Sequence, residues 1–129
     1  MPFRSTRTRM VHLNPLATQH YDTYESRMFD RTYLVDDANG DRWLYAGCVI
    51  AIDHPAGTFV PYSATASYGA GSDVPVAVTK EPYDMTLGAK VVTGVFHARL
   101  VEQYCYVFGA TRGAIPAAVK TALTLISWV

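Results

Sequence analysis

The run Cys-Val-Ile-Ala-Ile at residues 48–52 is the feature that most constrains the fold of this chain. It is continuously apolar, has the length of a strand and is rich in β-branched residues, which indicates a buried β-strand. Residues 53–57 then supply a turn, in which Gly57 can take a positive φ angle. Residues 58–62 follow as the partner strand, and Pro61 belongs at an edge or at a strand end because it cannot donate to a ladder. The segment therefore predicts a β-hairpin.

The residues after this hairpin continue to favour β-structure. We expect strands at 74–79 and at 89–101, the second interrupted at Gly94, where a glycine often marks a bulge or a close approach of two backbones. The Gly/Ser/Asp-rich stretch 67–73 is typical of a mobile loop, and residues 81–88 of a turn. Residues 102–110 are compatible either with a further strand or with a loop packed by its aromatic side chains.

The C-terminal end has a different pattern. Pro116 stands where the first turn of a helix tolerates proline, and alanine-rich residues of high helix propensity follow it, so that one short helix is expected within 113–123. Residues 124–129 then predict a final strand. Because this terminus is apolar, we expect it to be held in the sheet and not to fray. The fold class predicted is a compact, mostly β (α+β) domain with one short C-terminal helix before its last strand.

The composition changes near residue 42, which divides the chain into an N-terminal portion, 1–42, and a β-rich domain, 43–129. Residues 1–42 hold six arginines, no lysine, six acids and only scattered apolar residues. We interpret about 1–24 as an extended arm and 25–42 as a connection with little regular structure. The Asn39-Gly40 turn signal predicts a pairing of short strands around Tyr33–Val35 and Trp43–Tyr45.

The arm has three possible roles. Arg4, Arg7 and Arg9 stand against no acid in residues 1–12, and this segment offers a nucleic acid only about three phosphate contacts and a weak, salt-sensitive attachment. The alternation of arginine with Ser and Thr suits addition of a strand to the sheet edge of a partner protein. A solvated tail is the third reading. The residues alone do not decide between strand addition to a partner and a solvated tail.

Length, charge and cysteine usage exclude several classes of protein. A chain of 129 residues is expected to form one domain, and its formal net charge of zero excludes a generally basic surface for nucleic acid. Cys48 and Cys105 form no Cys-x-x-Cys pattern, which indicates buried thiols in a reducing compartment. The N-terminus shows no secretory signal, and the apolar stretch 114–129 is too short and interrupted for a membrane span. We expect a soluble, intracellular product.

No motif for catalysis, for a cofactor or for a metal is apparent. His12 and His20 are eight residues apart, which suits neither metal ligation on a helix nor a catalytic pair, and the Gly-rich loop lacks the Gly-Lys-Ser/Thr ending of a phosphate loop. His54 is expected in an exposed turn and His97 at an outward-facing strand position. A small β-barrel enzyme or ligand-binding protein would require His54, His97 and Asp53 to converge in one pocket.

From about Val49 to Val129 the chain resembles the lambda-type head decoration proteins of bacteriophages. The hairpin at 48–62 looks like the opening hairpin of that family, and 73–79 resembles its next strand, although Ala77 stands where glycine is common. The segment 91–100 looks like the family strand with an embedded glycine followed by Phe. The ending AAVKTALTLISWV is similar to the family's helix and last strand.

This resemblance implies a structural role without enzymatic activity. Members form homotrimers at local threefold positions on the outer surface of an expanded head. They bind the major capsid protein and stabilise the shell against the pressure of packaged DNA, and their N-terminal arms pair with the capsid protein. It implies synthesis in the host cytoplasm, location on the virion, and neither a membrane nor a direct nucleic-acid partner. Another phage module, from a tail, a baseplate or a head-fibre base, is the alternative.

The predicted contact residues fall into two sets. The first set is the arm, which would bind the capsid through Phe3, Arg4, Thr6, Arg7, Arg9, Val11 and Leu13. The second set comprises aromatic residues that would serve as trimer or capsid anchors, or else fill the core: Tyr62, Tyr68, Tyr83, Tyr104 and Phe108.

Overall fold

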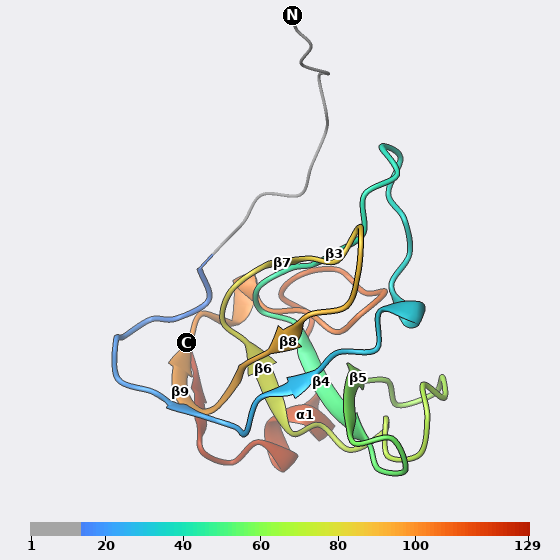
Figure 1. Ribbon diagram of the computed structural model, residues 1–129. Helices are drawn as coiled ribbons and strands as arrows, with labels where there is room; N and C mark the ends of the chain where they lie inside the picture. Colours follow the sequence, from blue (N-terminus) through green and yellow to red (C-terminus); the bar gives the residue numbers. More distant parts are fainter. Residues whose placement is uncertain (1–13) are drawn as a thin grey trace, which may run out of the picture.

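The structure is a computed structural model that describes residues 14–129 (Figure 1). The described residues form ten strands, one α-helix and two 3₁₀ helices. In chain order these are β1 (Asp22–Thr23), β2 (Arg27–Met28), η1 (Arg31–Tyr33), β3 (Trp43–Leu44), β4 (Val49–Asp53), β5 (Thr58–Pro61), β6 (Ala77–Thr79), β7 (Tyr83–Asp84), β8 (Val91–Val92), β9 (Gly94–Leu100), η2 (Glu102–Tyr104), α1 (Ala117–Ala122) and β10 (Ile126–Trp128).

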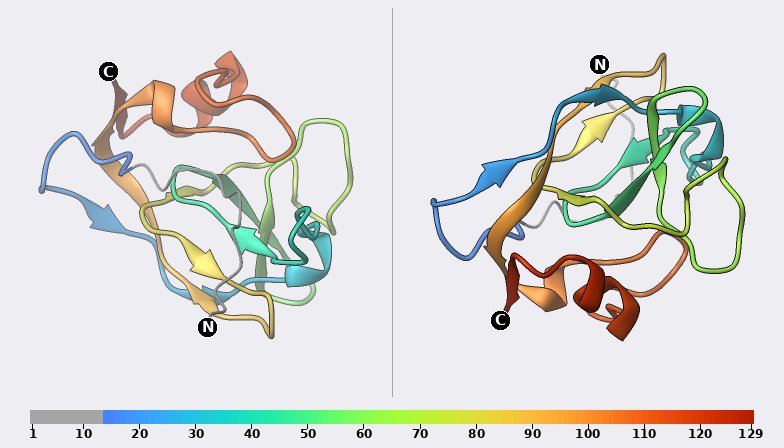
Figure 2. Two further views of the ribbon diagram at one scale, coloured as in Figure 1. Left: turned by 90° about the horizontal axis from the view of Figure 1, so that it is seen from above. Right: turned by 90° about the horizontal axis from the view of Figure 1, so that it is seen from below.

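One six-stranded sheet forms the centre of the domain. Its strands lie in the order β1-β9-β6-β4-β5, and β10 pairs with β9 in parallel, whereas the other neighbours are antiparallel. Two short ribbons, β2–β8 and β3–β7, lie on one side of this sheet, and α1 lies on the other (Figure 2). The predicted class, a mostly β domain with one short helix before a final strand, is confirmed.

Strand β4 has both of its faces buried. Val49 and Ala51 belong to the core cluster beneath α1, whereas Ile50 and Ile52 belong to the cluster beneath the two ribbons. Successive side chains of a strand point to opposite faces, so a strand covered on both sides needs an unbroken apolar sequence. The hairpin predicted from that run is confirmed: β4 and β5 pair from Asp53↔Thr58 to Ile50↔Pro61.

The C-terminal elements form as predicted. Helix α1 begins directly after Pro116, whose extended backbone (φ −63°, ψ 151°) precedes the first helical residue. Val119 and Ile126 are both buried in the cluster on the α1 side of the sheet, and β10 follows the end of β9 from Ile126↔Ala98 to Trp128↔Leu100. The apolar end of the chain is thus held by packing and by main-chain pairing.

Gly94 is a point of close contact between β9 and β6. A Cβ atom added to Gly94 would lie 2.8 Å from the Cβ of Ala77 and 3.2 Å from Cδ1 of Ile50. Both distances are shorter than ordinary contacts, so only glycine fits without movement of its neighbours. Of the two meanings expected for this glycine, the structure shows the close approach. It also shows that Ala77 is accommodated because residue 94 has no side chain.

The pairing predicted around Asn39-Gly40 is wrong. Trp43 and Leu44 pair with Asp84 and Tyr83 of β7, and not with residues 33–35. The turn itself exists, because Asp37 receives backbone hydrogen bonds from Asn39 and Asp41 through its Oδ1 at 2.8 and 3.0 Å. A turn signal in the sequence predicts only that the chain reverses its direction locally. Which strand β3 pairs with depends on how these segments pack over the core.

Residues 14–24, which we expect in an extended arm, pair with β9 of the domain, and residues 25–42, expected as a connection with little regular structure, contain only β2 and η1. Phe29 is fully buried, and its pairing with Phe59 places it against β5. Leu34 is buried in the same cluster. The apolar residues of this portion are few, and two of them, Phe29 and Leu34, close the core on the side of the two ribbons.

The Gly/Ser/Asp-rich loop is folded over the β4–β5 turn, in contrast to the expectation of a mobile loop. The amide of His54 donates to the carbonyl of Ala70 at 3.0 Å. Ser72 is buried, accepts from the amide of Tyr68 through its Oγ at 3.1 Å, and accepts through its carbonyl from the amide of Ser63 at 3.0 Å. Composition alone did not reveal this, because these bonds join residues up to 16 positions apart.

Replacing Gly94 with Ala is expected to destabilise the domain by about 1–3 kcal/mol, because the new methyl overlaps that of Ala77. The double variant G94A/A77G should recover much of that loss, since it restores the room between the strands. Urea unfolding of the two single variants and the double variant measures both effects. Strict additivity of the two free-energy changes would show that the contact does not exist.

Candidate interaction surface at the root of the N-terminal arm

The predicted capsid-binding residues of the arm lie outside the described residues. These are Phe3, Arg4, Thr6, Arg7, Arg9, Val11 and Leu13. What the structure describes is the place where the arm joins the domain. We call residues 14–24 the arm root.

The first attachment of the arm root is to the end of β9. Leu16 forms an antiparallel bridge with Leu100, the amide of Ala17 donates to the carbonyl of Arg99 at 2.8 Å, and that of Val101 donates to Pro15 at 2.8 Å. Pro15 is buried, and Leu16 packs against the core cluster on the α1 side. These contacts hold residues 15–17 against the end of β9.

The second attachment is β1, at the other end of the arm root. Asp22 lies opposite His97 and Thr23 opposite Val95, and the amide of Tyr24 donates to the carbonyl of Gly94 at 2.8 Å. Asp22 Oδ2 is 2.9 Å from His97 Nδ1, and the two side chains are 65% and 55% exposed. An ion pair exposed to this degree contributes little stability, at most about 1 kcal/mol. Main-chain pairing therefore dominates this attachment.

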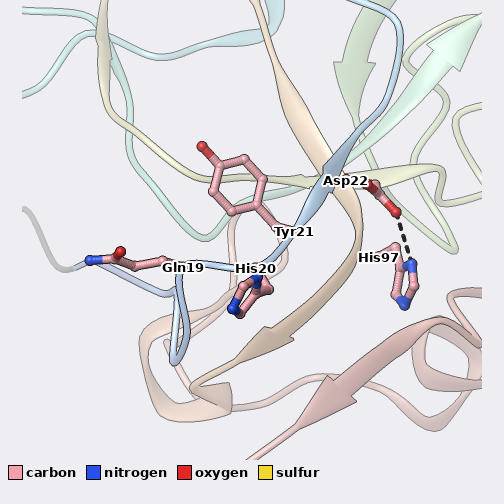
Figure 3. A pocket seen from close by; sticks show the side chains of 5 residues that line it. All are labelled: Gln19, His20, Tyr21, Asp22 and His97. Carbon is pink, nitrogen blue, oxygen red and sulfur yellow. Dashed lines mark hydrogen bonds and ion pairs between the residues drawn. The ribbon is translucent and has the colours of Figure 1, made fainter.

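Between the two attachments the arm root bows away from the sheet, as the blue loop in Figure 1 shows. An open pocket of about 300 Å³ lies beside it, lined by Gln19, His20, Tyr21, Asp22 and His97 (Figure 3). In Figure 3 Asp22 faces His97, whereas Tyr21 and His20 extend to different sides of the chain. A second hollow of about 540 Å³ borders Asn14, residues 16–19 and Tyr21.

The pocket at the arm root offers an Asp–His pair but no hydroxyl or thiol nucleophile among Ser, Thr and Cys. Its other lining groups are an amide, a second imidazole and a phenol. Within residues 14–129 there is no group of three or more His, Cys, Asp or Glu side chains that could hold a metal ion. The pocket is therefore suited to hydrogen bonding with a partner. The sequence does not predict it, because His97 and residues 19–22 lie in separate segments of the chain.

The structure does not bring together His54, His97 and Asp53, the three residues that the hypothesis of an enzyme or ligand-binding protein requires. His97 is on β9 and Asp53 ends β4, and β6 lies between these strands, which places them about 10 Å apart. His54 is exposed in the turn that follows β4, as expected. Neither Asp53 nor His54 lines the pocket that contains His97.

The predicted aromatic anchors occupy different environments. Tyr62 is part of the core, with 2% of its surface exposed. Tyr83 is half-buried, and its hydroxyl accepts from the amide of Thr93 at 3.0 Å. Tyr104 is half-buried in η2. The position of Tyr62 is explained by alternation, because it lies two residues beyond Val60 on the same face of the sheet.

Tyr68 and Phe108 meet in a cluster with Tyr33, a residue that the sequence did not single out as a contact residue. The ring centroids of Tyr33 and Tyr68 are 5.0 Å apart, and those of Tyr68 and Phe108 are 6.0 Å apart with nearly perpendicular planes. All three rings are half-buried. The edge-to-face pair of Tyr68 and Phe108 contributes about 0.5–1.5 kcal/mol beyond its buried area.

The two cysteines are buried and unpaired, as predicted. Burial raises the pKa of Cys48 to about 12 from a usual value of 9.0, although a hydrogen bond with Tyr106 lowers it in part. Burial likewise raises the pKa of Cys105 to about 12, against a lowering effect of Arg112. Thiols of this kind carry almost no reactive thiolate at neutral pH.

No protein-family model matches this chain, and no curated protein matches it either. In the part of the chain that the structure describes, none of the helices has the length and apolar character needed to cross a membrane.

Deprotonation of Cys48 and Cys105 is expected to destabilise the protein above about pH 9. The pKa values of both thiols are higher in the folded than in the unfolded protein. The stability that the two neutral thiols provide is therefore fully present below the unfolded pKa of 9.0 and is lost as the pH rises toward 12. Each thiol can lower the unfolding free energy by up to about 1.4 kcal/mol per pH unit in that window.

Urea unfolding between pH 7 and pH 11 measures this loss. The matched variant C48A/C105A should show a shallower decline above pH 9, since it retains every other titrating group. In the wild type, both thiols should also resist alkylation at pH 8 until urea unfolds the chain. Identical pH slopes for variant and wild type would contradict the assignment.

Proposed function

We propose that this protein is a lambda-type capsid decoration protein. In this proposal it binds the outer surface of an expanded phage head as a homotrimer and stabilises the shell against the pressure of packaged DNA. Its partner is the major capsid protein, and its location is the virion surface after synthesis in the host cytoplasm. The proposal includes no enzymatic activity, no cofactor, no membrane contact and no direct binding of nucleic acid.

The single observation that carries this proposal is the anchored arm root. Residues 15–17 exchange main-chain hydrogen bonds with Arg99 and Val101 at the end of β9. A segment that extends from a fixed point reaches a neighbouring surface at higher effective concentration than one attached through a flexible linker. The anchored root therefore supports a role in which the preceding residues bind a large partner.

The charge of the arm supports the same role. Residues 1–13 contain Arg4, Arg7 and Arg9 and no acid, whereas the whole chain has a formal net charge of zero. A segment of this kind favours an acidic surface or the edge of a partner's sheet, and its alternating Ser, Thr and Arg residues suit strand addition. Many copies on one shell would add weak individual contacts into a strong attachment.

Deletion of residues 2–13 is expected to abolish binding to expanded capsids while leaving the domain folded, because the arm root keeps its attachments to β9 and its buried Pro15. Co-sedimentation with expanded heads assembled from the cognate major capsid protein measures binding, and thermal unfolding measures the fold. We expect at least a tenfold loss of bound protein with little change in unfolding temperature.

A variant with residues 2–13 scrambled is the matched control, because it keeps the charge and composition of the arm. Binding equal to that of the wild type would show that charge alone is enough and that no strand pairs. Undiminished binding by the variant that lacks residues 2–13 would show that the arm does not bind the capsid. The number of copies per virion separates decoration, which needs hundreds, from a tail, baseplate or head-fibre component, which needs few.

A further inference from the structure

The turn at residues 36–41 contains a dipeptide with chemistry of its own. The chain has two asparagines, Asn14 and Asn39, and only Asn39 is followed by a glycine. In an Asn-Gly sequence the main-chain nitrogen of the glycine can attack the side-chain carbonyl carbon of the asparagine, because the glycine has no Cβ atom to hinder the approach. Asn14 precedes Pro15, whose nitrogen carries no hydrogen and cannot react in this way. Asn39 is therefore the one asparagine of the chain that this reaction can use.

This turn is accessible to water. It projects from the body of the domain as the turquoise segment in Figure 1, and Gly40 is exposed. Within the described residues, no atom outside the adjoining chain lies within 4 Å of the place where a Cβ atom on Gly40 would be. The reaction needs water in its second step, and the open surroundings of Gly40 provide it.

Asp37 holds the attacking nitrogen in place. The amide of Gly40 donates to the main-chain carbonyl of Asp37 at 3.0 Å. The Oδ1 atom of Asp37 accepts from the amides of Asn39 and Asp41 at 2.8 and 3.0 Å, which closes the turn around that bond. The nitrogen of Gly40 must lose its hydrogen to attack, so the hydrogen bond that it donates has to break first. The reaction therefore proceeds only from molecules in which the turn has opened locally.

We propose that Asn39 is a site of spontaneous deamidation and that Asp37 sets its rate. The nitrogen of Gly40 forms a bond to Cγ of Asn39, the bond from Cγ to Nδ2 breaks, and ammonia leaves with the proton of the Gly40 amide. Water then opens the resulting five-membered succinimide at either of its two carbonyl carbons, which leaves aspartate or isoaspartate at position 39. One water is consumed and one ammonia is released, and nothing is oxidised or reduced. This inference goes beyond the proposed function and does not rest on it.

The isoaspartate product changes the support of the β3–β7 ribbon. It adds one methylene group to the main chain between residues 39 and 40, so the hydrogen bonds between Asp37 and Asp41 lose their fit. Asp41 is buried, with 7% of its surface exposed. The next residue, Arg42, donates from its amide to Thr86 Oγ1 at 2.9 Å. A longer main chain in the turn therefore weakens the contact that joins it to the residues after β7.

Mass spectrometry of the full-length chain tests the proposal. The protein is kept at pH 8 in water enriched in oxygen-18, either folded or in urea, and is then digested with trypsin, which releases residues 32–42 as one peptide. We expect the amide of Asn39 to be replaced by a carboxyl group that carries one solvent oxygen, and the product to contain both aspartate and isoaspartate. Conversion should be at least about tenfold faster in urea, because the turn is open there.

Three variants separate the turn from general effects. D37A removes the acceptor of two amides, and we expect deamidation of the folded variant to be about two- to tenfold faster, the factor by which loss of one hydrogen bond shifts an equilibrium. D73A changes an exposed aspartate in another loop and is the matched control, with the rate of the wild type. N39Q should stay unconverted on the same timescale, because its longer side chain would have to close a six-membered ring.

Four results would overturn the proposal: no conversion of the unfolded wild type, aspartate without isoaspartate, equal rates in the folded and unfolded protein, or a D37A rate equal to that of D73A. A second measurement tests the effect on the ribbon. The purified isoaspartate form should unfold at a lower temperature than N39D, which carries the same charge without the extra methylene. Equal unfolding temperatures would contradict that effect. None of these measurements involves a capsid, so their outcome is independent of the proposed function.

Discussion

Burial of β4 on both faces is the constraint on which the rest of this structure depends. Val49 and Ala51 face the side covered by α1, and Ile50 and Ile52 face the side covered by the two ribbons. Burial of Val49, Ile50 and Ile52 contributes roughly 1.5–3 kcal/mol for each side chain, and burial of the smaller Ala51 contributes less. A strand of this kind cannot stay at a surface, so the chain must supply a cover for each face.

The two covers come from different parts of the chain. Helix α1 covers one face, and Ile126 of β10 packs in the same cluster, whereas Phe29 and the two ribbons cover the other face. The N-terminal portion reaches Phe29 after running along β9 as the arm root. The segment that holds the arm root therefore also brings Phe29 to the core.

The same arrangement keeps apart the side chains that could act in catalysis. Asp53, His54 and His97 are held on different strands and turns, whereas the thiols are buried where their raised pKa values make them unreactive. Apolar side chains that the core does not use lie at several places on the surface, among them Val35, Leu87 and Leu125.

Local patterns in the sequence determined the β4–β5 hairpin, the helix after Pro116, the last strand and the burial of both cysteines. Each of these depends on alternation, on a turn residue or on side-chain volume within a few neighbouring positions. Only the tertiary structure decided that β3 pairs with β7, that Phe29 completes the core, that the Gly/Ser/Asp-rich loop folds over a turn, and that Leu87 is exposed. These outcomes depend on which distant segments compete for the same buried surface, and that competition is settled by packing of the whole chain rather than by any local preference.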